Sequence, residues 1–237
     1  MRWLALALAA LALTGCETTQ EKSRKIEIRK RAEAKAPIAK GLEIAKPSRS
    51  ISVNSAVAFH STEGSAAAVI LRNHGAAQRE VPLLISVAQN GAPPATNGEP
   101  GIGRSLTSAT FVPAHGTAVW VDDQLTLSGT PGKVTVTVGE GKPARGAVPK
   151  IEIVSHRIEK EGSSETITGT VANHSAVSQH ELAVYALATR GGRTVAAGRG
   201  VVNLLAAGAS SKFQIFLDGA PTSGAKLTLL APPSTFR

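Results

Sequence analysis

Few residue patterns in this 237-residue chain have the spacing of a catalytic site. Ser223-Gly224-Ala225-Lys226 has the Ser-x-x-Lys spacing of an activated serine, but no S-D-N or K-T-G sequence accompanies it, and we expect a hairpin turn there. Gly101-Ile102-Gly103 lacks the third glycine of a dinucleotide-binding fingerprint. Asp122 and Asp123 are adjacent, so a strand would point them to opposite faces. We therefore predict no catalytic residue.

Metal ligands are also hard to assemble from this sequence. The six histidines, His60, His74, His115, His156, His174 and His180, show neither H-x-H nor H-x-x-x-H spacing. The single cysteine excludes an intramolecular disulfide and a cysteine-based zinc site. We predict no metal site and no cofactor.

The strongest motif lies at the start of the chain. Met1-Arg2 precedes an almost unbroken Leu/Ala stretch from Trp3 to Ala12, which is typical of a secretory signal and too short to span a bilayer. Leu13-Thr14-Gly15-Cys16 follows and resembles the lipobox of bacterial lipoproteins. The resemblance implies diacylglyceryl transfer to the Cys16 thiol and cleavage before Cys16. The alternative is an ordinary signal peptide that happens to contain a cysteine.

Acylation would make the mature protein a secreted, membrane-anchored one, because two or three acyl chains hold a protein at a membrane effectively permanently. Glu17 stands where the lipoprotein family's inner-membrane retention signal has Asp. The resemblance therefore implies the outer membrane in a Gram-negative host. In a host with one membrane, it implies the outer face of the cytoplasmic membrane.

Residues 16–50 are predicted to be a lipidated N-terminus followed by a flexible basic tether. Residues 20–50 hold ten Lys/Arg against four Glu and supply six of the nine net positive charges. This excess lies in a segment without aromatic residues, which argues against nucleic-acid binding. The segment is either a solvated spacer or a contact for an anionic lipid or wall polymer. The candidate contact residues are Lys22, Arg24, Lys25, Arg29, Lys30 and Arg31.

The rest of the chain repeats itself. Ile70–Ala76 has a counterpart in Thr170–Ala176, 100 residues later in the chain. We expect the same offset of 100 residues to continue through the next strand. Farther on the offset falls to about 93, so the first copy should carry a longer loop between Asn90 and Val112. Asn73 and Asn173 are expected to bond backbone groups where a strand ends.

Each copy is predicted to be all β. In the second copy, short runs rich in Val, Ile and Thr are separated by Gly, Pro, Asn and Ser. We expect two tandem immunoglobulin-like antiparallel β-sandwich domains at 51–139 and 150–237, with 140–149 as a linker. The expected strands of the second copy are 151–160, 166–173, 182–189, 195–204, 213–217 and 225–230.

The second copy also resembles a known domain family. Gly169–Asn173, Val184–Leu187 and Leu205–Gly208 before Phe213 are similar to the FxLYD type of immunoglobulin-like domain of bacterial envelope proteins. Thr189-Arg190 stands where that family usually has an acidic residue, and Ala207 replaces its proline. The resemblance implies a spacer, scaffold or binding module without shared catalysis.

The longer loop of the first copy, Gln89–Arg104, is the candidate binding loop, because recognition often resides on loops of a rigid sandwich. The alternative is a neutral surface insertion. Its candidate residues are Asn90, Gly91, Pro93, Pro94, Asn97, Glu99, Pro100 and Arg104.

Sugar binding is not favoured by the aromatic residues, because most of them are expected in the core. Beyond the signal segment these are Phe59, Phe111, Trp120, Tyr185, Phe213, Phe216 and Phe236. We therefore predict a non-catalytic binding or adaptor module that contacts an envelope protein through loops or edge strands. The alternative is a structural spacer that links the membrane to anionic polymers through the basic tether.

Overall fold

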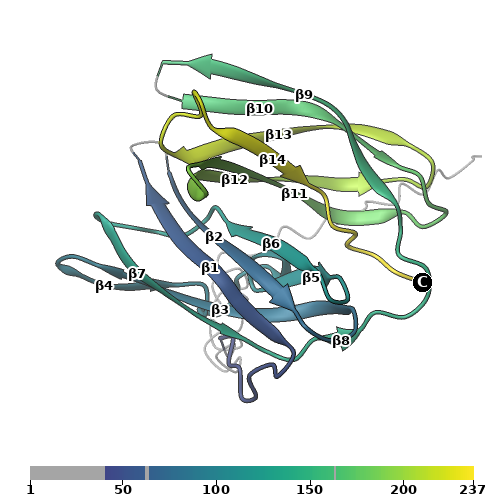
Figure 1. Cartoon of the computed structure of the whole chain (residues 1–237), viewed down its shortest axis with the longest axis horizontal. Coiled ribbons are helices and arrows are strands. Elements are labelled where there is room, and N and C mark those ends of the chain that lie inside the picture. The colour runs from purple at the N-terminus through teal and green to yellow at the C-terminus, as the bar shows by residue number, and fades with distance from the viewer. Residues whose placement is uncertain (1–40, 62–63, 163) are drawn as a thin grey trace, which may run out of the picture. The chain divides into compact units, whose positions relative to one another are not determined.

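Antiparallel strands make up nearly all of the regular structure in the computed structural model, which describes residues 41–61, 64–162 and 164–237 (Figure 1). The predicted all-β, sandwich-like fold is confirmed. One 3-10 turn, η1 (Arg104–Leu106), interrupts the strands. The strands are β1 (Ile51–His60), β2 (Ser65–Asn73), β3 (Gln78–Gln89), β4 (Ala92–Thr96), β5 (Ser108–Val112), β6 (Thr117–Asp122), β7 (Pro131–Val138), β8 (Lys142–Pro143), β9 (Ile151–Glu161), β10 (Ser164–Asn173), β11 (Gln179–Arg190), β12 (Arg193–Leu205), β13 (Ser210–Gly219) and β14 (Lys226–Leu230).

The first half, β1 to β8, consists of two sheets. One sheet has the order β1-β2-β6. In the other, β3 is central, with β4 and β5 along one edge and β7 and β8 along the opposite edge. Alternate residues of β3 are fully buried, as a strand with one apolar face requires, and they belong to the same core cluster as Val69 and Trp120.

The second half, β9 to β14, forms a sheet with the order β14-β11-β12-β13-β10-β9. β12 pairs with β13 only through Ala196 and Ala197, so the sheet bends there and folds over its own core cluster. A Cβ on Gly198 or Gly200 would lie 2.1 or 2.2 Å from a carbonyl oxygen of β13. Only glycine allows β12 to cross β13 this closely.

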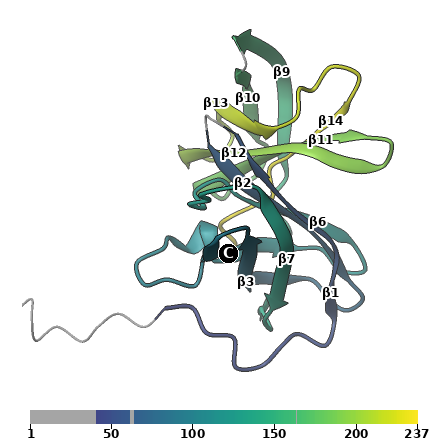
Figure 2. The same cartoon turned by 90° about the vertical axis from the view of Figure 1, so that its left-hand side faces the viewer.

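The two halves share one topology, because β1-β2-β6 corresponds to β9-β10-β13 and β7-β3 corresponds to β14-β11 (Figure 2). Both asparagines bond the backbone as expected. Asn73 Nδ2 donates to Pro113 O at 2.9 Å and Asn173 Nδ2 donates to Ala206 O at 3.1 Å. Beyond these asparagines, equivalent residues of the two halves are 101 positions apart rather than the predicted 100, as Gln78 and Gln179 at the starts of β3 and β11 show. The reason is that the turn after Asn173 is one residue longer than the turn after Asn73. Asn73 also bonds the carbonyl three residues on, and Asn173 bonds the one four residues on.

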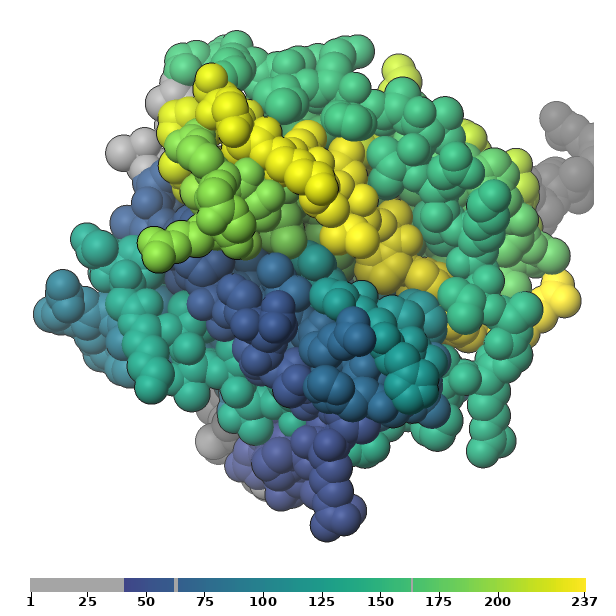
Figure 3. All heavy atoms as spheres, in the orientation of Figure 1, coloured from purple at the N-terminus to yellow at the C-terminus, as the bar shows by residue number. Residues whose placement is uncertain are grey.

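By their contacts, the residues from Lys40 to Arg237 form one compact unit. β8, inside the predicted linker 140–149, pairs with β3. The outward face of β11 contributes Ala183, Tyr185 and Leu187 to the core cluster of the first half. The C-terminal residues, yellow in Figure 3, lie against the first half, where the Phe236 and Phe111 ring centroids are 5.4 Å apart.

The last residues of the predicted tether are also bonded to the first half. Leu42 N donates to Gly98 O at 2.9 Å, and Ser48 N donates to Val138 O at 2.7 Å. Pro47 forms a bridge with Gly139. The expectation of a flexible tether up to residue 50 is therefore wrong for residues 42–48.

Candidate functional site

The predicted lipidation and polyanion-contact residues cannot be placed. Cys16, Lys22, Arg24, Lys25, Arg29, Lys30 and Arg31 all lie outside the described residues. Within the part of the chain that the structure describes, no helix is long and apolar enough to cross a membrane.

The predicted binding loop is partly a strand. Asn90 and Gly91 form a tight turn after β3, in which Gly91 has the positive φ of 75° that suits glycine. Pro93 and Pro94 lie in β4 with exposed side chains. β4 and β5 occupy the place that the single strand β12 has in the second half. The segment Asn97–Thr107 is thus an insertion between two pieces of one strand position.

Asn97 holds this insertion in the sheet. Its side chain is 1% exposed and occupies a ladder position beside β3, where it accepts from Ile85 N at 2.8 Å and donates to Leu83 O at 2.8 Å. It also donates to Leu106 O at 2.7 Å. Thr96 adds a hydroxyl bond to Ile85 O. All three of these hydrogen bonds go to backbone groups, so Asn97 has a structural role at the base of the insertion.

The remaining candidate residues surround an exposed tip. Glu99, Pro100 and Arg104 are exposed. Arg104 Nη1 lies 3.2 Å from Glu80 Oε2, which also accepts from Lys142 Nζ at 2.8 Å. The hydrogen bond from Lys142 and the nearby positive charges hold the pKa of Glu80 below its usual value. Behind the tip, the Trp120 indole donates to Ser105 O at 3.1 Å, so the base of the insertion is fixed by a fully buried side chain.

Two hollows flank the tip. One of about 380 Å³ lies between the insertion and residues 122–126, and the other, of about 500 Å³, lies between the insertion and Gly41–Glu43. Each has two carboxylates in its lining, Glu99 and Asp122 in the first and Glu43 and Glu99 in the second, beside glycine, threonine and apolar side chains. In the described ranges, no three His, Cys, Asp or Glu side chains are grouped as metal ligands would be.

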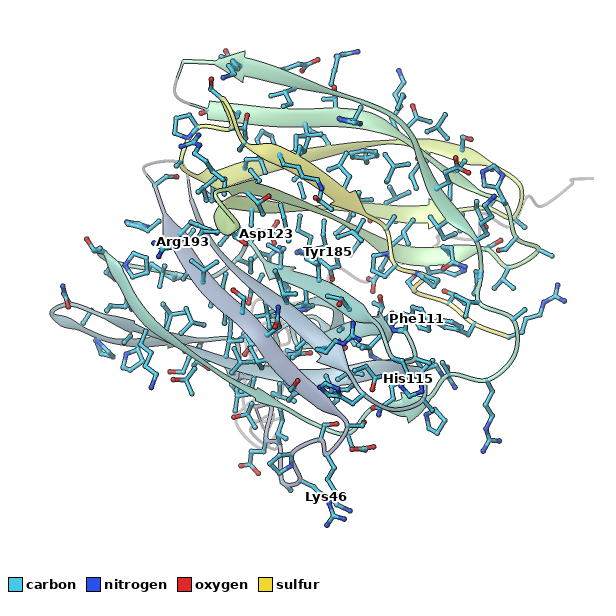
Figure 4. The ribbon with its side chains drawn as sticks, viewed as in Figure 1. Lys46, Phe111, His115, Asp123, Tyr185 and Arg193 are labelled. Atoms are coloured by element: carbon cyan, nitrogen blue, oxygen red, sulfur yellow. The ribbon has the colours of Figure 1, made fainter. Side chains whose placement is uncertain are left out.

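A buried ion pair between the halves was missed by the sequence analysis. Arg199 Nε donates to Asp123 Oδ1 at 2.9 Å, with only 3% of the Arg199 side chain exposed. Asp123 and Tyr185 are labelled in Figure 4, where they lie between β6 and the β11–β12 pair. β6 ends at Asp122, so Asp123 lies just outside the strand, and burial raises the pKa of Asp122 to about 6. No local signal links residues 76 positions apart.

The aromatic residues are mostly, but not entirely, in the core. Trp120, Tyr185 and Phe213 are buried as predicted. Phe216 is an exception to the expectation that most of them lie in the core, because 65% of it is exposed. Its position in phase with Lys212 and Gln214 could have indicated this, because alternate residues of a strand share a face.

No protein-family model matches the chain, and no curated protein sequence matches it significantly. The resemblances to lipoproteins and to FxLYD domains therefore remain predictions.

Proposed function

We propose that this chain is a lipid-anchored protein of the bacterial cell envelope that acts without catalysis, as a binding or adaptor module for another envelope protein. The anchor in this proposal is acylated Cys16, on the strength of Leu13-Thr14-Gly15-Cys16. The contact surface is the exposed tip of the insertion, Glu99–Arg104.

One observation carries the proposal: two halves with the same strand order differ by an insertion that is rigid at its base and exposed at its tip. A neutral insertion needs no internal support, because loops tolerate added length at little cost. This insertion is instead fixed by the buried Asn97 side chain and the Trp120–Ser105 bond. A rigid base presents the tip in one geometry, which reduces the entropy lost on binding.

The test is cross-linking in cells, followed by mass spectrometry of the captured proteins. The tip variant Glu99→Ala/Pro100→Ala/Ile102→Ala removes side chains that line the hollows or project beside them and leaves Asn97 in place. Ser223→Ala/Lys226→Ala, at the turn that leads into β14 of the second half, is the matched control.

We expect a discrete protein to be captured by the unchanged chain and the control but lost from the tip variant. Equal capture by all three chains would refute the tip as the contact surface. Capture of lipid or wall material alone would refute the adaptor function. Replacement of Cys16 by serine should release the chain from membranes, and retention of that variant would refute the lipid anchor.

A further inference from the structure

The outward face of β9, β10 and β13 is polar and arranged in rows. These strands pair in register, so each residue of β10 has one neighbour on either side. One row is Arg157, Thr168 and Gln214, and the next is Ser155, Thr170 and Lys212. The alternating residues Phe213 and Ile215 of β13 point into the core instead.

These rows line a groove of about 580 Å³ that also includes His156 and Val201. No carboxylate is among its lining residues. Lys212 has no ion-pair partner in the described ranges, whereas Arg157 uses its Nε for Glu159 beside the groove. The Thr168 hydroxyl also bonds Glu159. The groove thus offers the hydroxyls of Ser155 and Thr170, the Gln214 amide and the Lys212 ammonium, a combination that is complementary to an anion with hydroxyl groups around it.

The groove is held open by close packing beneath it. A Cβ on Gly169 would lie 2.3 Å from Ser155 O and 2.5 Å from the Phe213 ring, so a side chain there would force the strands apart. The Phe213 ring instead covers Gly169 from the neighbouring strand, since the two residues are register partners. The shape of the groove is therefore built into the core.

The exposed Phe216 lies on the same face as Gln214, one row beyond the groove, in the row Glu159, Thr166 and Phe216. The Glu159 carboxylate at the far side of this row is paired with Arg157. Three successive rows cover about 14 Å along the strands and about 10 Å across them, enough for two or three sugar rings. The negative face of an aromatic ring attracts positively polarised C–H groups, as one face of a sugar ring presents them. Sugar binding was not favoured from the sequence because most aromatic residues were expected in the core. Phe216 is instead exposed and provides a ring on which a sugar can stack.

We propose that this face binds an acidic glycan, one whose sugars carry carboxylate or phosphate groups. One sugar ring stacks on Phe216, and the acidic group of another ring along the strands pairs with Lys212. Hydroxyls of the rings bond to Thr170 and Gln214. The site is separate from the insertion tip and does not depend on the proposed adaptor function.

The test is isothermal titration calorimetry of the full chain carrying Cys16→Ser, which prevents acylation. The probes are an oligogalacturonate and a phosphomannan as acidic glycans, a maltooligosaccharide as a neutral glycan, and polyglutamate as a polyanion without sugar rings. The variants are Phe216→Ala and Lys212→Ala, with Leu204→Ala and Lys226→Ala as exposed controls from the same half. The basic residues of the N-terminal segment stay in every chain, so their contribution is common to all.

We expect one or both acidic glycans to bind, with the tighter one identifying the acidic group, and Phe216→Ala to weaken that binding about tenfold. Lys212→Ala should weaken it as well, while both controls bind like the unchanged chain. The affinity for polyglutamate should be the same for the unchanged chain and for Phe216→Ala, because polyglutamate has no sugar ring to stack on Phe216. Equal binding of polyglutamate and the glycans, an unchanged affinity in Phe216→Ala, or no glycan binding at all would each overturn the proposal. Thermal unfolding of each variant shows that it is folded, since both side chains point into solvent.

Discussion

Replacement of Asn97 by alanine tests whether this side chain substitutes for a missing strand. The change leaves Ile85 N–H, Leu83 C=O and Leu106 C=O without their partner in a buried position. Each unsatisfied buried group costs about 1–3 kcal/mol. Asn97 also lines the 380 Å³ hollow, from which water can reach part of the gap, so the lower end of this range applies.

We therefore expect Asn97→Ala to lower the free energy of unfolding by about 3 kcal/mol. The measurement is urea denaturation followed by circular dichroism, on the full chain with Cys16→Ser. Asn90→Ala, in the exposed turn of the same segment, is the control, and it should change stability by less than about 0.5 kcal/mol. Asn97→Asp should cost at least as much as alanine, because it keeps the acceptor for Ile85 N but places a carboxylate oxygen against two carbonyls. If Asn97→Ala were as harmless as Asn90→Ala, the side chain would not be replacing ladder hydrogen bonds.

Three further predictions concern the polar groups between and beneath the sheets. Because burial raises the pKa of Asp122 above its unfolded value to about 6, folding favours the protonated carboxyl, whose contribution is largest below about pH 4 and is lost as the pH rises through about 6. Asp122→Asn should thus raise the free energy of unfolding by about 3 kcal/mol at about pH 7.5 and by little at about pH 4, and an equal effect at both values would contradict the shift. The Tyr185 hydroxyl is buried without a hydrogen-bond partner among the described residues, so Tyr185→Phe should stabilise the protein by about 1 kcal/mol in thermal unfolding, whereas a loss would reveal a bound water. Asp123→Asn leaves the buried Arg199 guanidinium without its counterion and should cost about 3 kcal/mol, of which an added Arg199→Met restores at least half. A double variant no more stable than Asp123→Asn in urea would show that the penalty does not come from the unpaired charge.

The sequence by itself determined the all-β class, because both of its signals are local. Alternation of apolar and polar residues places one face of a strand inside, and glycine, proline and asparagine end the strands. The expected strand 182–189 is the centre of β11, and the expected strand 213–217 is the centre of β13. The repeat also led correctly to Asn73 and Asn173, because the same side-chain bonds are needed wherever the same turn recurs.

The tertiary structure alone decided how the two halves meet and which loop residues are available. The sequence places Asn97 in a polar, proline-rich stretch, and only the gap between β4 and β5 gives it three buried partners. Likewise, Arg199 is one of many scattered charges until β12 brings it to Asp123. The partners of Asn97 are 9 to 14 residues away and that of Arg199 is 76 residues away, so neither contact follows from the residues next to it in sequence. Burial makes the loss of either contact costly to stability. Phe216 is the opposite case, since its strand position was predictable but its exposure depends on which face of β13 remains uncovered.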